Sequence, residues 1–350
     1  MSESTPLNGV IPKYNDEEQN LEEYDDYQKP WSSKTKAIIY TSIGAITLVL
    51  LWFFTIILPN YYIPKAIPLQ PIVHISDVNV SILPHHHKSQ VNRLIMIGDI
   101  HGHYKEFQKL LKKANYNNKK DELIVLGDFI TKGPDNFKML DYLINNNISC
   151  IMGNHEFYLL QNYATFHMLD QPSFLNNDPP PEFKIKDSFN NDPEFILAKK
   201  LQPKHVEYIN NCSIIKELGD VSLIGTTLTP GIAVHAGVRP DLTLVQQNPI
   251  DNMEMRSLIG PYYNETSAER DVPNAISWSK VYNSKKGKPP ANYVVYYGHD
   301  AGRGLNLKKY TKGLDSGCDK GGKLSALIIT STKKKNGDIK LVEEIVQINC

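Results

Sequence analysis

The sequence predicts an α/β sandwich behind one N-terminal transmembrane helix. Three observations predict this arrangement. An uncharged apolar run of 22 residues lies near the N-terminus. Farther on, short apolar runs that end in glycine alternate with amphipathic stretches, as strands and helices do in α/β domains. Near the C-terminus, two strand-like runs flank a turn-like KKKNG.

The apolar run covers residues 37–58 and is long enough to cross a hydrocarbon core of about 30 Å as a helix. A cleaved signal peptide is the alternative. However, the run starts far from Met1 and ends in Pro59-Asn60-Tyr61 rather than in a cleavage site with small residues. Trp31 before it and Trp52, Tyr61 and Tyr62 at its other end suit the two membrane interfaces. We expect a retained signal anchor.

Basic residues predict the orientation of this anchor. Lys29, Lys34 and Lys36 precede it, whereas only Lys65 follows closely, so the N-terminus should be cytosolic. Residues 1–36 carry eight acidic and four basic side chains and few aliphatic ones, which indicates a disordered tail. The rest should be lumenal, and four sequons for N-linked glycans lie there, at Asn79, Asn147, Asn211 and Asn264.

Residues 59–91 contain five prolines and the triplet His85-His86-His87, and we interpret them as a lumenal stalk. The triplet could hold a metal, but a solvated stalk is the favoured interpretation. The domain itself should cover residues 92–350.

Within the domain, three apolar runs are buried-strand candidates, and the stretches between them have helical periodicity. A segment rich in Asn, Asp and Pro, at about 166–205, should be a surface insertion, which could also cap the active site. Two last runs should form a β-hairpin that closes a sheet. The strand candidates are 93–98, 122–127 and 148–153, the helices are 103–114 and 134–146, and the hairpin strands are 323–331 and 338–348.

Composition excludes several classes of function. The four cysteines show no C-x-x-C spacing, which excludes a structural zinc cluster. A disulfide is permitted in a lumen, with three full pairings open, although Cys150 in its apolar run is expected to be a buried core residue instead. Neither a P-loop nor a Rossmann glycine pattern is present. The net charge of zero points to no nucleic-acid partner.

Five short segments place metal-binding side chains directly after strand-like runs. Loops at the carboxyl ends of neighbouring strands meet at one edge of a sheet, so these residues can share one cluster. Their oxygen and nitrogen ligands suit zinc, iron or manganese. The segments are Gly98-Asp99-Ile100-His101-Gly102, Gly127-Asp128, Gly153-Asn154-His155-Glu156, His235-Ala236-Gly237 and Gly298-His299-Asp300.

In order and residue type, these segments resemble the calcineurin-like metallophosphoesterase superfamily, whose fold is two packed sheets flanked by helices. The resemblance implies two metal ions bridged by Asp128 and a shared hydroxide that attacks phosphorus. His155 would protonate the leaving oxygen as general acid. Zinc is the first expectation, with manganese, cobalt, iron and magnesium open. The implied ligands are Asp99, His101 and Asp128 for one ion and Asp128, Asn154, His235 and His299 for the other.

The second segment departs from the protein Ser/Thr phosphatases, which carry an aspartate and an arginine where this chain has Thr131 and Lys132. It is instead similar to the diadenosine-tetraphosphate-hydrolase branch. Within that branch, an anchored lumenal domain resembles the fungal vacuolar endopolyphosphatases. His103 and Glu156 should support ligands or begin helices rather than bind metal. The candidates for binding substrate phosphate are Lys132, Arg256, Lys280 and Arg303.

The resemblance therefore implies a hydrolase that cleaves internal bonds of inorganic polyphosphate and is anchored in the vacuolar membrane. A dinucleoside polyphosphate hydrolase and then a protein Ser/Thr phosphatase are the enzymatic alternatives. An inactive lumenal binding module is the alternative from another class, and it is disfavoured because every ligand position is filled.

Overall fold

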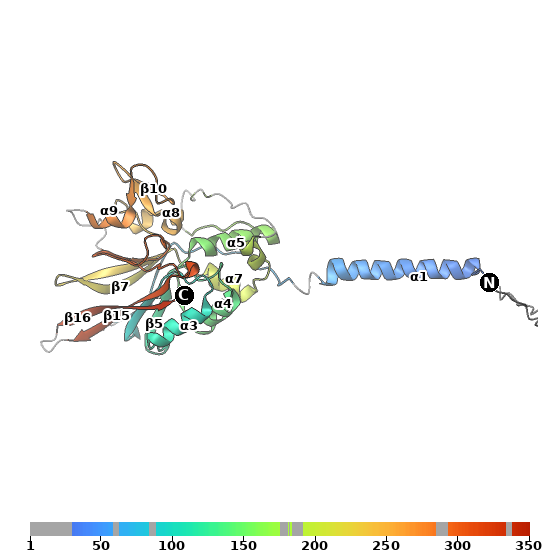
Figure 1. Ribbon diagram of the computed structural model, residues 1–350, viewed down its shortest axis with the longest axis horizontal. Coiled ribbons are helices and arrows are strands. Elements are labelled where there is room, and N and C mark those ends of the chain that lie inside the picture. Colours follow the sequence, from blue (N-terminus) through green and yellow to red (C-terminus); the bar gives the residue numbers. More distant parts are fainter. Residues whose placement is uncertain are drawn as a thin grey trace, which may run out of the picture. The chain divides into compact units, whose positions relative to one another are not determined.

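The computed structural model describes residues 30–58, 63–83, 89–175, 181, 183, 192–284, 293–333 and 338–350 (Figure 1). The chain divides into two compact units, Met1–Asn60 and Tyr61–Cys350.

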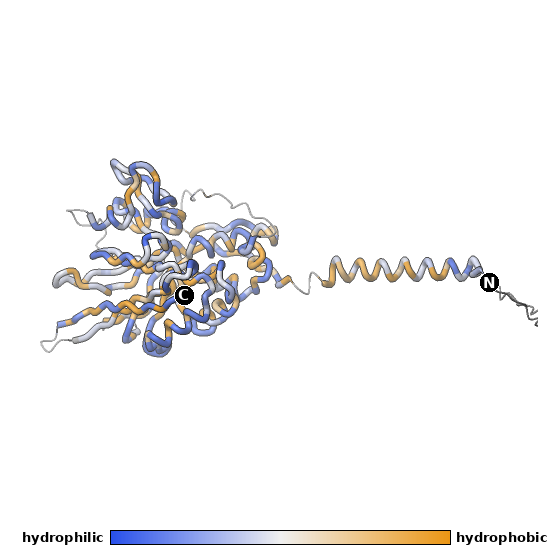
Figure 2. The backbone as a smooth tube through the Cα atoms, in the orientation of Figure 1, coloured by the Kyte–Doolittle hydropathy of each residue, from blue (hydrophilic) through white to orange (hydrophobic). Residues whose placement is uncertain are grey.

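The first unit contains helix α1 (Ser33–Trp52), which continues as a short π-helical segment, η1 (Phe53–Ile57). The Ser32 hydroxyl caps the helix by accepting a hydrogen bond from the Thr35 N–H at 3.1 Å. Residues Ser33–Ile57 are long and apolar enough to cross a membrane, and none of them is buried within the protein. Figure 2 shows apolar residues along most of this helix.

The second unit contains two large sheets. The six-stranded sheet has the order β1-β7-β8-β12-β14-β13, and the five-stranded sheet has the order β16-β15-β4-β5-β6. The strands of the first are β1 (Ile75–Asp77), β7 (Ile215–Ile224), β8 (Thr227–Val234), β12 (Val294–Tyr297), β13 (Asn306–Leu307) and β14 (Thr311–Gly313). Those of the second are β4 (Arg93–Ile97), β5 (Asp121–Val125), β6 (Ser149–Cys150), β15 (Lys323–Lys333) and β16 (Ile339–Asn349).

Helices cover the outer faces of both sheets. In Figure 1, α3 and α4 lie beside the sheet that contains β5 and β15, while α8, α9 and β10 lie beyond β7. Two minor sheets join β10-β9-β11 and β2-β3. The helices are α3 (Tyr104–Lys113), α4 (Asn136–Asn145), α5 (Asn154–His167), α6 (Pro193–Ala198), α7 (Pro203–Asn210), α8 (Pro249–Glu254) and α9 (Trp278–Ser284), with 3-10 turns η2 (Leu244–Gln246) and η3 (Cys318–Lys320). The remaining strands are β2 (Val80–Ser81), β3 (Ser89–Gln90), β9 (Ser257–Ile259), β10 (Glu265–Ser267) and β11 (Ala275–Ser277).

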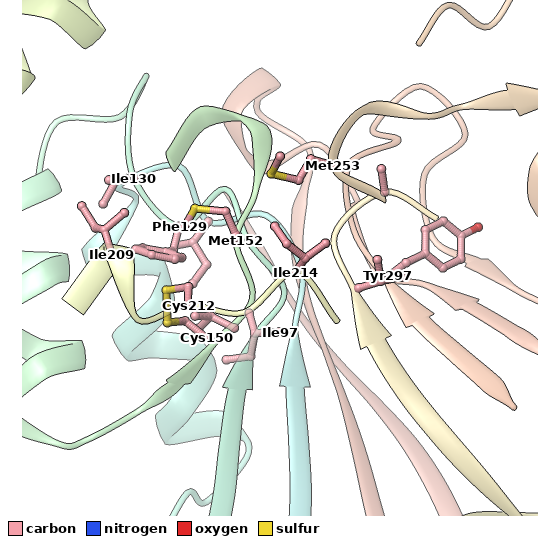
Figure 3. Close-up of a cluster of buried hydrophobic side chains, with 14 of the residues drawn as sticks. Ile97, Phe129, Ile130, Cys150, Met152, Ile209, Cys212, Ile214, Met253 and Tyr297 are labelled. Atoms are coloured by element: carbon pink, nitrogen blue, oxygen red, sulfur yellow. A yellow bond between two sulfur atoms is a disulfide. The ribbon is translucent and has the colours of Figure 1, made fainter. Parts of the chain in front are cut away.

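Alternate residues of each strand build two hydrophobic layers, because successive side chains point to opposite faces of a sheet. Leu94 and Met96 of β4 join Ala233 and Tyr296 in the layer between the sheets. Ile95, with its neighbours on the other face of β4, joins the layer beneath the helices. Figure 3 shows part of this second layer, which reaches the carboxyl ends of the strands.

Strand direction brings the functional loops together. β4, β5 and β6 are parallel neighbours, and so are β8, β12 and β14 in the other sheet. Every motif found in the sequence follows one of these parallel strands. The predicted sandwich of two sheets flanked by helices is therefore confirmed, as are the three strands, the two helices between them and the C-terminal hairpin of β15 and β16.

Two expectations were wrong. Much of the expected stalk belongs to the domain, because β1 pairs with β7 at a sheet edge and Ile72 and Val78 are buried. Cys150 is buried as expected, but it forms a disulfide with Cys212, which follows α7 (Figure 3). A disulfide is apolar enough to lie in a core, so burial did not argue against pairing. A second disulfide joins Cys318 to Cys350.

Other expectations fall on parts of the chain that are only partly described. The His85–His87 triplet and most of the acidic tail lie outside the described residues. The described parts of the insertion include α6, whose Leu197 and Ala198 are buried. All four sequon asparagines are exposed, Asn147 among them.

Candidate active site

The predicted site residues meet where the parallel strands of both sheets end. Asp99 and His101 follow β4, and Asp128 follows β5. Asn154 and His155 begin α5, directly after β6. From the other sheet, His235 follows β8 and His299 follows β12. One polar cleft is lined by Asp99, His101, Asp128, Asn154, His155 and His299, together with Lys132, Arg256, Arg270, Ala301, Gly302, Asp315, Asp319 and Lys320.

Two glycines of the motifs are required by close approach. A Cβ at Gly153 would lie 2.3 Å from Asp128 Oδ1, and a Cβ at Gly298 would lie 2.2 Å from Asp99 Oδ1. Any larger residue at either position would displace a carboxylate of the cleft. These distances explain the glycine that begins each of these two motifs.

Three of the proposed metal ligands adopt the left-handed backbone region, which non-glycine residues rarely occupy. The φ angles are 48° for His101, 48° for Asp128 and 68° for His299. Such strain concentrates at functional sites, because the surrounding structure must hold it in place. Here it turns each side chain into the cleft immediately after its strand.

Asp128 is the shared member of two groups that could each hold a metal ion. One group is His101, Asp128 and His155, and the other is Asp128, His235 and His299; in each, the ligand atoms lie within 4.8 Å of one another. A carboxylate has two oxygens, so Asp128 can serve both groups at once.

Backbone carbonyls orient three of the histidines. The Nδ1–H groups of His101 and His235 donate to the carbonyls of Ile130 at 3.3 Å and Leu126 at 2.8 Å. His299 donates from Nε2 to the Glu254 carbonyl at 3.0 Å. We assign these tautomers from the hydrogen-bond partners. In each ring, the other nitrogen then carries a lone pair, as in histidines that bind metal.

The polar atoms of four of these site residues converge at His235. Asn154 Oδ1, His299 Nδ1 and Asp128 Oδ1 lie 3.1, 3.2 and 3.3 Å from His235 Nε2. Burial lowers the pKa of His235, but the charge of Asp128 and the hydrogen bond to it raise this pKa, so a protonated ring can donate to one of these atoms. In the neutral ring that would bind metal, all four atoms are acceptors. Acceptors this close repel one another unless a cation lies among them, so the donor set fits a divalent metal ion.

The buried charges point the same way. Burial, together with the charges of Asp315 and Asp128, raises the pKa of Asp99 well above its ordinary value. Burial raises the pKa of Asp315 to about 6. Burial lowers the pKa of His101 to about 4, which keeps this ring neutral and able to bind metal. Cations in the cleft would relieve the repulsion among these carboxylates.

His155 has a different partner from the other histidines. Its Nδ1–H donates to Glu194 Oε1 at 2.5 Å, while its Nε2 faces Asp128 Oδ2 at 3.9 Å. Burial lowers the pKa of His155, but the charge of Asp128 and the bond to Glu194 outweigh this effect and raise it. A raised pKa suits a group that must carry a proton.

Glu156 is fully buried and supports the loop that carries Asp128. Its Oε2 accepts from the Asp128 N–H at 2.7 Å and the Gly153 N–H at 3.1 Å. Its Oε1 accepts from the N–H groups of Phe129 and Ile130 at 3.0 and 3.2 Å. Burial and the charge of Asp128 raise its pKa to about 7, whereas these four donors favour the ionised form. Glu156 therefore fixes the Asp128 loop rather than lining the cleft.

The sequence reasoning proposed four phosphate-binding residues, and the structure brings two of them to the cleft. Lys132 Nζ donates to His101 Nε2 at 3.0 Å and pairs with Asp319 at 3.3 Å, and Arg256 donates to the His299 carbonyl at 3.3 Å. The described residues that line the cleft do not include Lys280 or Arg303.

The surroundings of Lys280 and Arg303 explain why neither side chain lines the cleft. Lys280 is exposed on α9. Arg303 pairs with Asp300 and donates to the Arg256 carbonyl and the Ser257 hydroxyl, so it supports the loop of Arg256.

Five residues in or beside the cleft were not singled out from the sequence. None of them belongs to the five segments from which the sequence predicted the site. A Cβ at Gly302 would overlap the Arg270 guanidinium, so a larger residue there would make this side chain move from its position in the cleft. The five residues are Glu194, Arg270, Asp315, Asp319 and Lys320.

The sequence profile of the calcineurin-like phosphoesterases matches residues 92–303, more than half of the chain. The chain belongs to the calcineurin-like phosphoesterase family. It is similar to the zinc-dependent endopolyphosphatase of Saccharomyces cerevisiae, with 29% identity over 83% of this chain and 88% of that protein. It is also similar to the symmetrical bis(5'-nucleosyl)-tetraphosphatase of Buchnera aphidicola, with 28% identity over 66% of this chain and 92% of that protein.

A solved structure described as that of a candidate diadenosine tetraphosphatase has the same fold. Its TM-score is 0.53 at 25% identity, and the match covers 76% of this chain and 97% of the other chain. This calcineurin-like phosphoesterase is thus a hydrolase, with Asp and His groups placed to hold metal.

Proposed function

We propose that this phosphoesterase is a metal-dependent endopolyphosphatase that hydrolyses internal phosphoanhydride bonds of inorganic polyphosphate. The observation that carries the proposal is the set of polar atoms converging on His235 Nε2, which fits a divalent cation. The similarity to a zinc-dependent endopolyphosphatase over most of both chains supports zinc and this substrate.

The proposed ligands are those expected from the sequence. Two divalent cations, when bound, would activate water as a nucleophile and stabilise the negative charge that develops on phosphorus. One would be held by Asp99, His101 and Asp128, and the other by Asp128, Asn154, His235 and His299.

The chain's own groups would do the rest. His155 would hold a proton at Nε2 and deliver it to the leaving phosphate oxygen. Lys132 donates to the His101 lone pair, and its side chain is 42% exposed, so its flexible stem can swing the ammonium toward substrate. With Arg256, Arg270 and Lys320 it would bind successive phosphate units.

The cleft lining favours polyphosphate over a dinucleoside polyphosphate. Nucleobases usually stack on aromatic side chains, and the described residues of the lining include no Phe, Tyr or Trp. Hydrolysis of diadenosine tetraphosphate is nevertheless the second candidate, because the chain is similar to enzymes of that name over most of their length.

To test the function, we would incubate the full chain, solubilised in detergent, with long-chain polyphosphate and added zinc, cobalt, manganese or magnesium. Chain length would be read on a gel. Metal-dependent shortening to intermediate lengths is expected, and Asp128→Asn should abolish it. Asp135→Asn is a matched control, because this carboxylate pairs with Lys138 outside the cleft. Intact polyphosphate in every metal would refute the proposal, and turnover of diadenosine tetraphosphate or a phosphopeptide instead would identify the alternative.

We also propose that residues 33–57 anchor the enzyme with its N-terminus cytosolic and the catalytic domain lumenal. The apolar helix, the four exposed sequon asparagines and the two disulfides support this topology, since disulfides persist in oxidising compartments. The vacuolar membrane is the proposed location on the resemblance alone. Glycosidase treatment of the protein from intact cells should increase its gel mobility, and replacing all four asparagines with glutamine should remove that change. Unchanged mobility before and after glycosidase would contradict a glycosylated lumenal domain.

A further inference from the structure

Glu194 lies in the segment that the sequence indicated as an insertion, yet it contacts the core of the active site. It belongs to α6, which packs against α5, the helix that begins with Asn154 and His155. Its side chain is 7% exposed. Its Oε1 lies 2.5 Å from His155 Nδ1. A carboxylate is costly to bury, so its position against one ring nitrogen requires an explanation.

The geometry divides the two nitrogens of His155 between two tasks. A carboxylate can only accept, so Nδ1 must carry a hydrogen when it faces Glu194. Nε2 then faces the cleft, 3.9 Å from Asp128 Oδ2, where substrate would lie. Glu194 thereby fixes both the rotation of the ring and the position of its hydrogen.

The other three histidines of the cleft provide an internal comparison. His101, His235 and His299 each bond a neutral backbone carbonyl. A carbonyl is sufficient to orient a neutral ring that uses its lone pair as a ligand. A carboxylate also stabilises the positively charged imidazolium, which is the form that a general acid requires. The partner of each ring therefore matches its proposed task.

Among the described residues, Thr131 does not replace Glu194 as the group that orients His155. The sequence placed Thr131 where related phosphatases carry an aspartate that orients the catalytic histidine. The Thr131 hydroxyl is buried and has no hydrogen-bond partner among the described residues, so it does not orient His155. The carboxylate comes instead from a helix 39 positions beyond His155.

We propose that Glu194 is the positioning residue for His155 and that α6 thus completes the active site. This inference rests on the proposed role of His155 as general acid. It does not depend on which phosphoanhydride or phosphate ester is the substrate.

A double-mutant cycle tests the proposal in the detergent-solubilised full chain, with zinc and whichever phosphate substrate the wild type hydrolyses. Glu194→Gln should lower kcat and kcat/KM equally, by about 10- to 100-fold, with KM unchanged. His155→Asn should lower kcat by about 100-fold or more. In the His155→Asn background, Glu194→Gln should cause no further loss, because the ring that it positions is gone. Glu194→Asp should recover part of the rate.

Three controls separate positioning from a general structural effect. Asp192→Asn removes an acidic residue two positions earlier, whose side chain does not cap α6, and it should leave kcat unchanged. Melting temperature and zinc content should match the wild type in both Glu194 variants.

Each alternative result has a definite meaning. Multiplicative losses in the double variant, or a loss explained by missing zinc, would overturn the positioning role while leaving the proposed function intact. Full activity of His155→Asn would overturn the general acid and, with it, the role of Glu194.

Discussion

The carboxylate of Glu156 offers a sharp test of how the Asp128 loop is held. We consider Glu156→Gln, which keeps the shape of the side chain. Each carboxylate oxygen accepts hydrogen bonds from two backbone N–H groups. In the glutamine, an NH2 group takes the place of one of these oxygens, so two of the four N–H groups lose their acceptor. Two buried N–H groups without acceptors cost about 1–3 kcal/mol each, or about 2–6 kcal/mol together. This is a large share of the stability of a domain.

The same change should weaken metal binding, because one of the four donors is the N–H of Asp128, whose strained φ of 48° depends on this support. Urea unfolding of the detergent-solubilised full chain at pH 8 would measure the free energy. Its signal is the fluorescence of Trp278, which is buried and is the single tryptophan of the unit Tyr61–Cys350. Zinc content would be measured on the same samples.

Glu122→Gln is the matched control. Glu122 accepts one hydroxyl, that of Ser149 at 2.7 Å, and an amide oxygen can accept it equally well. Burial raises the pKa of Glu122, so loss of its charge also removes a desolvation cost. We expect this variant to unfold within about 1 kcal/mol of the wild type. Equal losses in the two variants, or wild-type stability and zinc content for Glu156→Gln, would refute the reasoning.

Three further predictions concern the cross-link, the metal and the cleft. Cys350→Ser opens the disulfide to Cys318, which lies 32 positions away in the sequence. A cross-link across a loop of this length contributes about 3–4 kcal/mol to the free energy of unfolding. The free energy of unfolding in urea should therefore fall by that amount in oxidised protein and stay the same in reduced protein. Acidification should release zinc, because Asp99 has a raised pKa and takes up a proton as the pH falls through it; zinc retained after dialysis should therefore decrease as the buffer is made more acidic, and retention that does not change with pH would contradict this. Gly302→Ala places a methyl group on the Arg270 guanidinium and should raise KM for polyphosphate about tenfold with little change in kcat, whereas an unchanged KM would contradict this prediction.

Local motifs predicted the centre of the site because each proposed ligand follows the end of a strand within a few residues. The strands were visible as short apolar runs, and parallel strands bring their carboxyl ends to one edge. Asp99, Asp128 and His299 could therefore be expected near one another from their spacing and residue type.

Residues whose position depends on packing could not be predicted in this way. Glu194 lies in a polar segment, and only the packing of α6 on α5 brings it to His155. Charge alone suggested Lys280 and Arg303, but charge does not tell which face of a helix or loop meets the cleft. The three residues of β1 are too few to show a periodic pattern, so an edge strand was interpreted as a stalk.

The strand order also has a consequence for biosynthesis. β4, which carries Asp99 and His101 at its end, lies between β5 and β15, and Ile97 pairs with Ala326. During translation, β15 is made long after β4 and β5. Until β15 has been made, one side of β4 has no partner, and the first metal group is attached to an open sheet edge. Stable capture of a divalent cation by this group would therefore require a chain that extends at least through β15.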